Sequence, residues 1–134
     1  MDVFFARAVD FRNEDQLSGE RTSIEAKLRE AGLIMVDPLL SEPPNRDPIT
    51  LVQHDLKLLA SSSAMLALMT IPNRNYIGVC CELVYANVLH IPTFVCVGES
   101  DYAARPFLQY HSTFIGRTVE ECISRICKHC DKNR

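Results

Sequence analysis

Residues 64–86 read AMLALMTIPNRNYIGVCCELVYA, and this stretch decides the fold. It begins with an uninterrupted apolar run at residues 64–69, which is typical of a strand buried on both faces of a sheet. A loop that contains Pro72 follows, and Gly78 leads into a helix that we expect over about residues 79–89. A strand that passes through a loop into a covering helix is the repeating unit of parallel α/β folds.

The same alternation extends in both directions along the chain. Short apolar runs predict further strands at residues 3–6, 33–36, 92–97 and 113–115. Capping residues and apolar spacing predict helices at residues 22–31, 50–60 and 118–130, and the polar residues 12–20 are expected to form a loop. The sequence therefore predicts an α/β fold in which helices cover both faces of a parallel sheet.

Length and composition limit the class of protein. The 134 residues fit one domain, which we expect to span residues 1–134. The net charge of −3 offers no basic surface for a nucleic-acid polymer, although a single nucleotide needs only one or two cations. No apolar run is long enough to cross a membrane, and no basic segment precedes an apolar one at the N-terminus. We therefore expect a cytoplasmic protein without a membrane partner.

The six cysteines raise the possibility of a disulfide scaffold. A full apolar core pattern and the lack of a secretory signal favour reduced thiols instead. Near the C-terminus, four residues have a loose metal-binding spacing: Cys122, Cys127, His129 and Cys130. Because this spacing fits no standard zinc pattern, we interpret it as thiols along one helix and expect no metal.

Ligands of parallel α/β sheets bind beyond the carboxyl ends of the strands, which here selects residues 6–10, 37–40, 70–82 and 98–105. Glu82 is expected in the first turn of the helix after Gly78, where the helix dipole favours the ionised carboxylate. An ionised carboxylate in a fixed position is a suitable nucleophile for a sugar carbon. A glutamate on the solvent face of the helix explains the same pattern equally well.

Three other residues are candidates for a binding site. Asp55 lies on a predicted helix, and two carboxylates around a glycosidic bond divide the attack on the sugar and the proton transfer. Arg7 follows the first strand, where its guanidinium suits a phosphate. Tyr76 lies on the loop before Gly78, within reach of a base. The alternative for Asp55 is an exposed position on the helix. For Arg7 it is a surface salt bridge, and for Tyr76 it is the ordinary polarity of a loop.

A set of motifs resembles the nucleoside 2-deoxyribosyltransferase superfamily over most of residues 1–98. The set comprises Val3-Phe4-Phe5-Ala6, Asp55-Leu56 on a helix, Gly78-x-x-x-Glu82-Leu83-x-x-Ala86, and Ile91-Pro92 before a strand. The superfamily includes transferases that exchange bases and N-glycosidases that hydrolyse nucleoside 5'-monophosphates. The resemblance implies a flavodoxin-like (Rossmann-like) three-layer sandwich with a five-stranded parallel sheet.

The resemblance also implies roles for individual residues. Glu82 is expected to attack the anomeric carbon, and Asp55 is expected to bind or protonate the base. The expected substrate-binding residues are Phe4, Ala6, Arg7, Tyr76 and Gly78. No metal or organic cofactor is expected. A homodimer or larger assembly is expected, in which a neighbouring subunit completes each site. Four polar residues are candidates for that contribution: Arg105, Gln109, His111 and Ser112.

The chain departs from the transferases at three places. Phe4 stands where they have a tyrosine, which removes a hydroxyl beside Glu82 and leaves room for a 2'-OH. Tyr76 stands where they have an aspartate. Arg7, between two alanines, replaces the small Gly or Ser residues and is a candidate phosphate contact.

These features favour hydrolysis of a nucleoside 5'-monophosphate to free base and (deoxy)ribose 5-phosphate. Base exchange by a deoxyribosyltransferase is the second hypothesis. A non-catalytic nucleotide-binding module is the third, because Glu82 without the tyrosine hydroxyl is less firmly positioned. The sequence leaves open the base, the 2' substituent and the need for phosphate.

Overall fold

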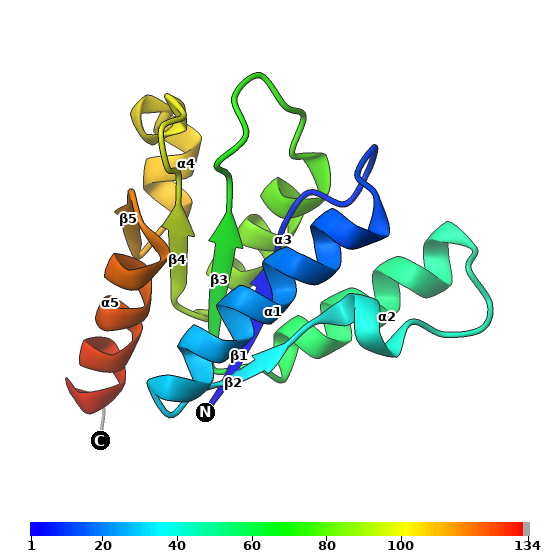
Figure 1. The fold of residues 1–134 in the computed structure, drawn as a ribbon, viewed down its shortest axis with the longest axis horizontal. Helices are drawn as coiled ribbons and strands as arrows, with labels where there is room; N and C mark the ends of the chain where they lie inside the picture. Colours follow the sequence, from blue (N-terminus) through cyan, green and yellow to red (C-terminus); the bar gives the residue numbers. More distant parts are fainter. Residues whose placement is uncertain (133–134) are drawn as a thin grey trace.

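The computed structural model describes residues 1–132. Five strands form one sheet: β1 (Asp2–Ala6), β2 (Ile34–Val36), β3 (Ala64–Leu68), β4 (Thr93–Cys96) and β5 (Phe114–Gly116). All neighbouring strands pair in parallel in the order β2-β1-β3-β4-β5, which is the flavodoxin-like order. The predicted fold class is confirmed (Figure 1).

Helices cover both faces of the sheet, as predicted. They are α1 (Glu14–Glu30), α2 (Pro48–Ala60), α3 (Ile77–Val88), α4 (Pro106–His111) and α5 (Val119–Lys132), with short 3-10 helices η1 (Pro38–Ser41) and η2 (Tyr102–Ala104). Helices α1 and α5 pack on one face, and α2, α3 and α4 pack on the other (Figure 1). No helix within residues 1–132 is long and apolar enough to cross a membrane.

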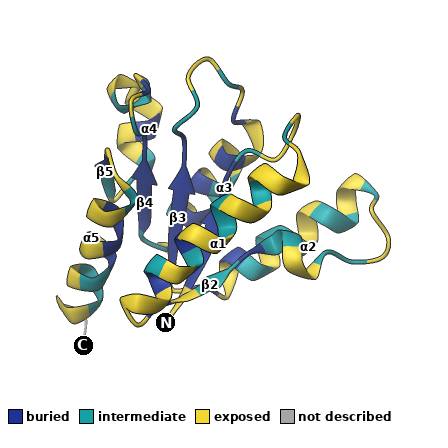
Figure 2. Ribbon diagram, in the orientation of Figure 1, coloured by how far each residue is buried: buried dark blue, intermediate teal, exposed yellow. Residues whose placement is uncertain are grey.

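Alternation along β1 supplies both halves of the core. Val3 and Phe5 point into the cluster beneath α1 and α5, whereas Phe4 and Ala6 point into the cluster beneath α2 and α3. Burial in Figure 2 is concentrated in the strands and on the inner faces of the helices. The face that carries Phe4 is therefore also the face that carries α2 and α3.

The prediction of a loop at residues 12–20 was wrong, because α1 begins at Glu14. Asn13 caps the helix: its side chain accepts the Gln16 N–H at 2.8 Å, and the Gln16 side chain accepts the Asn13 N–H at 3.2 Å. This reciprocal capping box holds a first turn that has little apolar surface to bury. The predicted stop at Gly32 is confirmed by its positive φ of 81°.

Helix α4 was also missed, because six residues are too few to show a periodic pattern. Its signal was Pro106, which occupies the first turn where a missing N–H costs nothing. The predicted cap of the last helix is present, since the Thr118 hydroxyl accepts the Glu121 N–H at 3.1 Å.

Candidate active site

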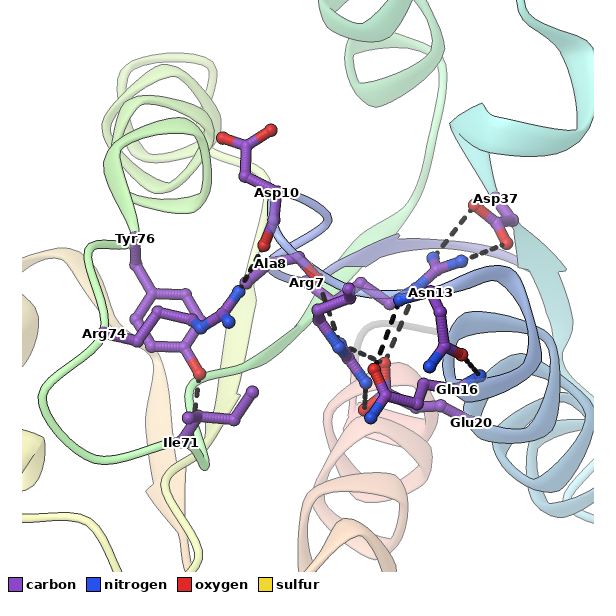
Figure 3. Close-up of polar contacts among 11 residues, drawn as sticks. Arg7, Ala8, Asp10, Asn13, Gln16, Glu20, Asp37, Ile71, Arg74 and Tyr76 are labelled. Carbon is purple, nitrogen blue, oxygen red and sulfur yellow. Dashed lines mark hydrogen bonds and ion pairs between the residues drawn. The ribbon is translucent and has the colours of Figure 1, made fainter.

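A pocket of about 370 Å³ opens at the carboxyl end of the sheet, between the loop after β1 and the start of α3. We call it the α3-entry pocket. The Arg74 guanidinium crosses it and donates a hydrogen bond to the Asp10 carbonyl oxygen at 2.6 Å (Figure 3). The lining residues are Arg7, Ala8, Val9, Asp10, Phe11, Asn73, Arg74, Asn75, Ile77, Gly78 and Val79. This is one of the places where the sheet rule predicted a ligand.

Gly78 leaves space for a ligand at the start of α3. A Cβ atom added to it would meet no other atom within 4 Å. The first N–H groups of a helix have no partner within the helix, and together with the dipole they attract anions. The Asn75 side chain accepts the Ile77 N–H at 3.0 Å, so the N–H groups just beyond it are those left for a ligand.

Glu82 lies in the second turn of α3, close to the helix start where the sequence predicted it. It follows Gly78 by four residues, so both lie on one face of the helix. The side chain is half-buried. Burial, and then the negative charge of Asp55, raise the pKa of Glu82 to about 8. The expectation that the helix dipole keeps it ionised was therefore wrong, because desolvation outweighs a dipole effect that fades beyond the first turn.

Asp55 on α2 is brought close to Glu82 by the packing of α2 against α3. Burial raises the pKa of Asp55, and the charges of Glu42 and Asp37 raise it further, whereas His54 lowers it. The two acidic candidates thus share one environment in which at least one proton is retained near neutral pH. Adjacent carboxyl groups with raised pKa values are typical of acid–base chemistry.

Phe4 and Ala6 lie on the face of the sheet that α2 and α3 cover. Phe4 is completely buried in the same apolar cluster as Leu59 of α2 and Leu83 of α3. Its ring offers no hydrogen bond to Glu82, in keeping with the departure noted in the sequence. Ala6 lies in the same cluster. Its small side chain can contribute to a ligand site only by leaving space.

Arg7 is held by the protein itself. Its two terminal nitrogens donate to the Asp37 carboxylate at 3.0 Å each, and its Nε lies 3.6 Å from Glu20 (Figure 3). The guanidinium also stacks over the Phe5 ring at 4.5 Å. A phosphate contact through the fork of Arg7 would require the Asp37 pair to open, so this geometry favours a structural role.

Tyr76 points away from the α3-entry pocket. Its hydroxyl accepts the Ile71 N–H at 3.0 Å, and its ring meets the edge of Tyr102 with a centroid distance of 5.7 Å. Tyr102 in turn accepts the Arg74 N–H at 2.9 Å. The two tyrosines shape the loop that carries Arg74. A base contact by the Tyr76 side chain remains a prediction to which this orientation gives no support.

The fold is shared with enzymes that act on nucleosides and nucleotides. A 2-deoxyribosyltransferase from Bacillus psychrosaccharolyticus matches with a TM-score of 0.71 and 16% identity, over 90% of this chain and 89% of that one. A CMP N-glycosidase from Clostridium botulinum matches with a TM-score of 0.62 and 16% identity, over 94% of this chain and 98% of that one. The chain shares the fold of these two enzymes.

The same architecture also carries redox chemistry. A flavoenzyme NAD(P)H:(acceptor) oxidoreductase from Paracoccus denitrificans matches with a TM-score of 0.62 and 12% identity, over 98% of this chain and 97% of that one. No protein-family model matches the sequence, and the search of curated proteins finds no match. At these identities the similarity defines the fold, and the function has to be argued from the site.

A second pocket of about 370 Å³ lies on the far side of Tyr76, between α3 and α4. We call it the α3–α4 groove. Of the four C-terminal candidates, Arg105 and His111 line it, whereas Gln109 bonds to the Ala103 carbonyl oxygen and Ser112 to that of Leu108. The groove is otherwise mainly apolar, which makes it a surface for a partner more than a site for a polar ligand.

The sequence did not predict the roles of three residues at the site. Asp37 lay in a segment selected by the sheet rule, but nothing local indicated that it pairs with Arg7. Asp10 contributes only a carbonyl oxygen. Phe11 is fully exposed at the rim of the pocket and has a positive φ of 63°, which is unusual for a bulky residue. An isolated aromatic residue in a polar stretch was its only signal.

Proposed function

We propose that the chain hydrolyses the N-glycosidic bond of a nucleoside 5'-monophosphate. The observation that carries the proposal is the pair of interacting carboxyl groups of Asp55 on α2 and Glu82 on α3. Neither of them lines the α3-entry pocket, but Gly78, which does, lies one helical turn before Glu82 on α3. The carboxyl groups supply the chemistry of a glycosidic bond. The N–H groups at the start of α3 and the Arg74 side chain suit the phosphate. The fold shared with a CMP N-glycosidase and a 2-deoxyribosyltransferase supports the same substrate class.

The proposed reaction has two steps. The Glu82 carboxylate attacks the anomeric carbon as the bond to the base breaks, and Asp55 delivers a proton to the departing base. A water molecule then attacks the same carbon, Asp55 takes a proton from it, and the bond to Glu82 breaks. The products are the free base and the sugar 5-phosphate. Phe4 leaves the 2' side of the sugar without a hydroxyl partner.

Base release tests the proposal directly. The purified protein is incubated with ribo- and deoxyribonucleoside 5'-monophosphates and with the matching nucleosides, and free base is followed by chromatography. Release from monophosphates alone is the expected result. Release only after a second free base is added would identify a transferase. Nucleotide binding by calorimetry without release in either case would identify a binding module.

The pH profile reports the protonation state of Glu82. With a pKa of about 8, only about a tenth of Glu82 is ionised at pH 7. Because Glu82 must be ionised while Asp55 is protonated, the reactive form holds one proton between the two carboxyl groups, and kcat/KM is expected to fall as the pH rises through about 8. Asp55→Asn removes the proton donor and a neighbouring negative charge, so it is expected to lower the rate and to leave an activity that rises with pH as Glu82 ionises at a lowered pKa. Asp131→Asn, an exposed substitution at the other end of the sheet, is expected to leave the profile unchanged. A profile that instead rises over this range in the unmodified protein would exclude Asp55 as the proton donor.

Gly78→Ala is expected to weaken substrate binding without lowering the stability of the protein. The added methyl group projects into the α3-entry pocket, so KM is expected to rise roughly tenfold, the lower end of the effect of one methyl-sized change in a binding site. Stability is expected to stay the same or rise by up to about 1 kcal/mol. Gly19→Ala on α1 is the matched control, because a Cβ there also meets nothing within 4 Å. Its expected effect is on stability alone. An unchanged KM for Gly78→Ala would place the substrate elsewhere.

We also propose a homodimer through the α3–α4 groove. Phe107 and Tyr110 of α4 are 81% and 76% exposed, and Val84 and Val88 of α3 extend the same apolar surface. Phe107→Asp is expected to yield monomers in size-exclusion chromatography with light scattering, whereas Phe11→Asp, at an exposed phenylalanine outside this surface, is expected to leave the mass unchanged. A monomeric unmodified protein would contradict the proposal.

The cysteines support the proposed cytoplasmic location. All six are thiols in the structure, as expected for a protein of a reducing compartment. Cell fractionation tests the location of the protein. Chromatography of the protein purified without a reductant tests whether its cysteines are thiols.

A further inference from the structure

The amino-terminal end of the sheet carries another cavity, with a volume of about 610 Å³. Residues that immediately precede four strands line one side of it: Met1, Leu33, Ser63 and Pro92. The last turns of α5 line the other side. The α3-entry pocket lies at the opposite, carboxyl end of the sheet and shares no lining residue with this cavity, so the two sites are separate and neither proposal depends on the other.

Three residues that carry sulfur atoms line this cavity: Met1 with its thioether, and Cys127 and Cys130 with their thiols. His90, His129 and Asp131 line it as well. The Cys130 and Met1 sulfur atoms are only 2.8 Å apart. Met1 is fixed in place because its carbonyl oxygen accepts the Ile34 N–H at 2.9 Å. The Cys127 thiol lies 3.9 Å from the Ala31 carbonyl oxygen, which also lines the cavity.

The position of the two thiols follows from the amphipathic face of α5. Ile123 and Ile126 are buried against the sheet, and Cys127 and Cys130 continue this face toward the end of the helix. Residues three apart on a helix are neighbours, so both thiols reach one end of the sheet. The sequence interpretation treated these residues as thiols along one helix. It had no means of placing Met1 beside them.

The donor set selects a soft metal ion. Thiolate and thioether ligands favour Cu(I), whereas structural zinc takes four nitrogen, oxygen or thiolate ligands. Within residues 1–132, no three His, Cys, Asp or Glu side chains form a metal site by themselves, so a site at this cavity needs the Met1 thioether as a ligand. We propose that Met1, Cys127 and Cys130 bind Cu(I). The ion enters and remains as Cu(I), and its binding releases the two thiol protons to solvent.

Titration of the reduced, full-length protein with Cu(I) under argon, with bicinchoninate as the competing chelator, tests the proposal. One equivalent is expected to bind. Cys127→Ser and Cys130→Ser are each expected to weaken binding by more than roughly 100-fold, since even the loss of an outer partner costs roughly 10–100-fold. Met1→Leu, made from a cleavable fusion, is expected to weaken it less, because a neutral thioether is a weaker ligand than a thiolate.

The matched control is the double variant Cys80→Ser/Cys81→Ser, which removes two exposed thiols on α3. It is expected to bind Cu(I) as the unmodified protein does. Loss of binding in this variant, with retention in Cys127→Ser/Cys130→Ser, would overturn the proposal. Circular dichroism checks that each variant is folded. X-ray absorption of the unmodified protein gives an independent answer: sulfur-only coordination supports the site, and nitrogen coordination contradicts it. Base release in the absence of copper is expected to be unaffected by either thiol substitution.

Discussion

Glu82→Gln is expected to lower the rate of base release about 10⁴-fold. This is the upper end of the loss for a positioned proton-transfer group, and it applies because the amide cannot form the glycosyl-enzyme bond. The change is nearly isosteric, and it replaces a buried ionisable group with a neutral one, so the fold should be retained. Free base is measured by chromatography over hours with the monophosphate that the unmodified protein cleaves best.

Two further variants decide whether Glu82 is the nucleophile. Glu25→Gln replaces another half-buried glutamate, on the opposite face of the sheet, and is expected to keep full activity. Glu82→Ala leaves room for a small anion, so added formate is expected to restore part of its activity by replacing the missing carboxylate. Full activity of Glu82→Gln would remove this residue from the mechanism. Loss of activity without formate rescue would instead indicate a role in proton transfer.

The central part of the fold was predictable because its signals are local. The apolar run of β3 and the Gly78 entry to α3 are both continuous in sequence, and they place Glu82 on the correct helix and near the correct edge of the sheet. Asp55 was predictable for the same reason, since α2 is a regular helix next to β3. The sequence did not determine how deeply Glu82 is buried. Burial depends on α2 packing against α3, and it raises the pKa of Glu82 to about 8.

The expectations to which the structure gives no support concern side chains with partners elsewhere in the fold. Arg7 was expected at a phosphate because its position after β1 is known from the sequence, whereas its partner Asp37 is brought to it only by the pairing of β1 with β2. Tyr76 was expected at a base, but its hydroxyl accepts the Ile71 N–H and its ring packs on Tyr102. In both cases a long polar side chain satisfies a buried contact that no local pattern reveals.

Asp37→Ala is expected to destabilise the protein by about 3–5 kcal/mol, because it removes both hydrogen bonds of the buried Arg7 guanidinium and leaves it only the more distant Glu20 carboxylate, 3.6 Å from its Nε. The side chains of Arg7 and Asp37 are 3% and 0% exposed, and two parallel hydrogen bonds of 3.0 Å join them. Asp37 also accepts the Leu39 N–H at 3.0 Å, so the substitution removes the cap of η1 as well. Urea denaturation followed by circular dichroism gives the free energy of unfolding.

An ion pair of the same length at the surface provides the control. Arg46 and Glu42 also lie 3.0 Å apart, but the Arg46 side chain is 71% exposed. Glu42→Ala is therefore expected to cost less than about 1 kcal/mol. A similar loss for both variants would show that burial of the Arg7 pair is not what makes it important.

The double variant Arg7→Met/Asp37→Leu separates the net contribution of the ion pair to stability from the loss of stability caused by leaving one of its charges unpaired. Replacing a buried ion pair with apolar residues of similar size is often neutral or stabilising, and methionine retains a favourable contact with the Phe5 ring. We expect the double variant to recover most of the stability lost in Asp37→Ala, apart from about 1 kcal/mol for the lost cap. If it also retains base release, Arg7 acts by holding the loop after β1 and not by binding phosphate. If stability returns and KM rises for monophosphates but not for nucleosides, the result supports the phosphate contact predicted for Arg7 from the sequence.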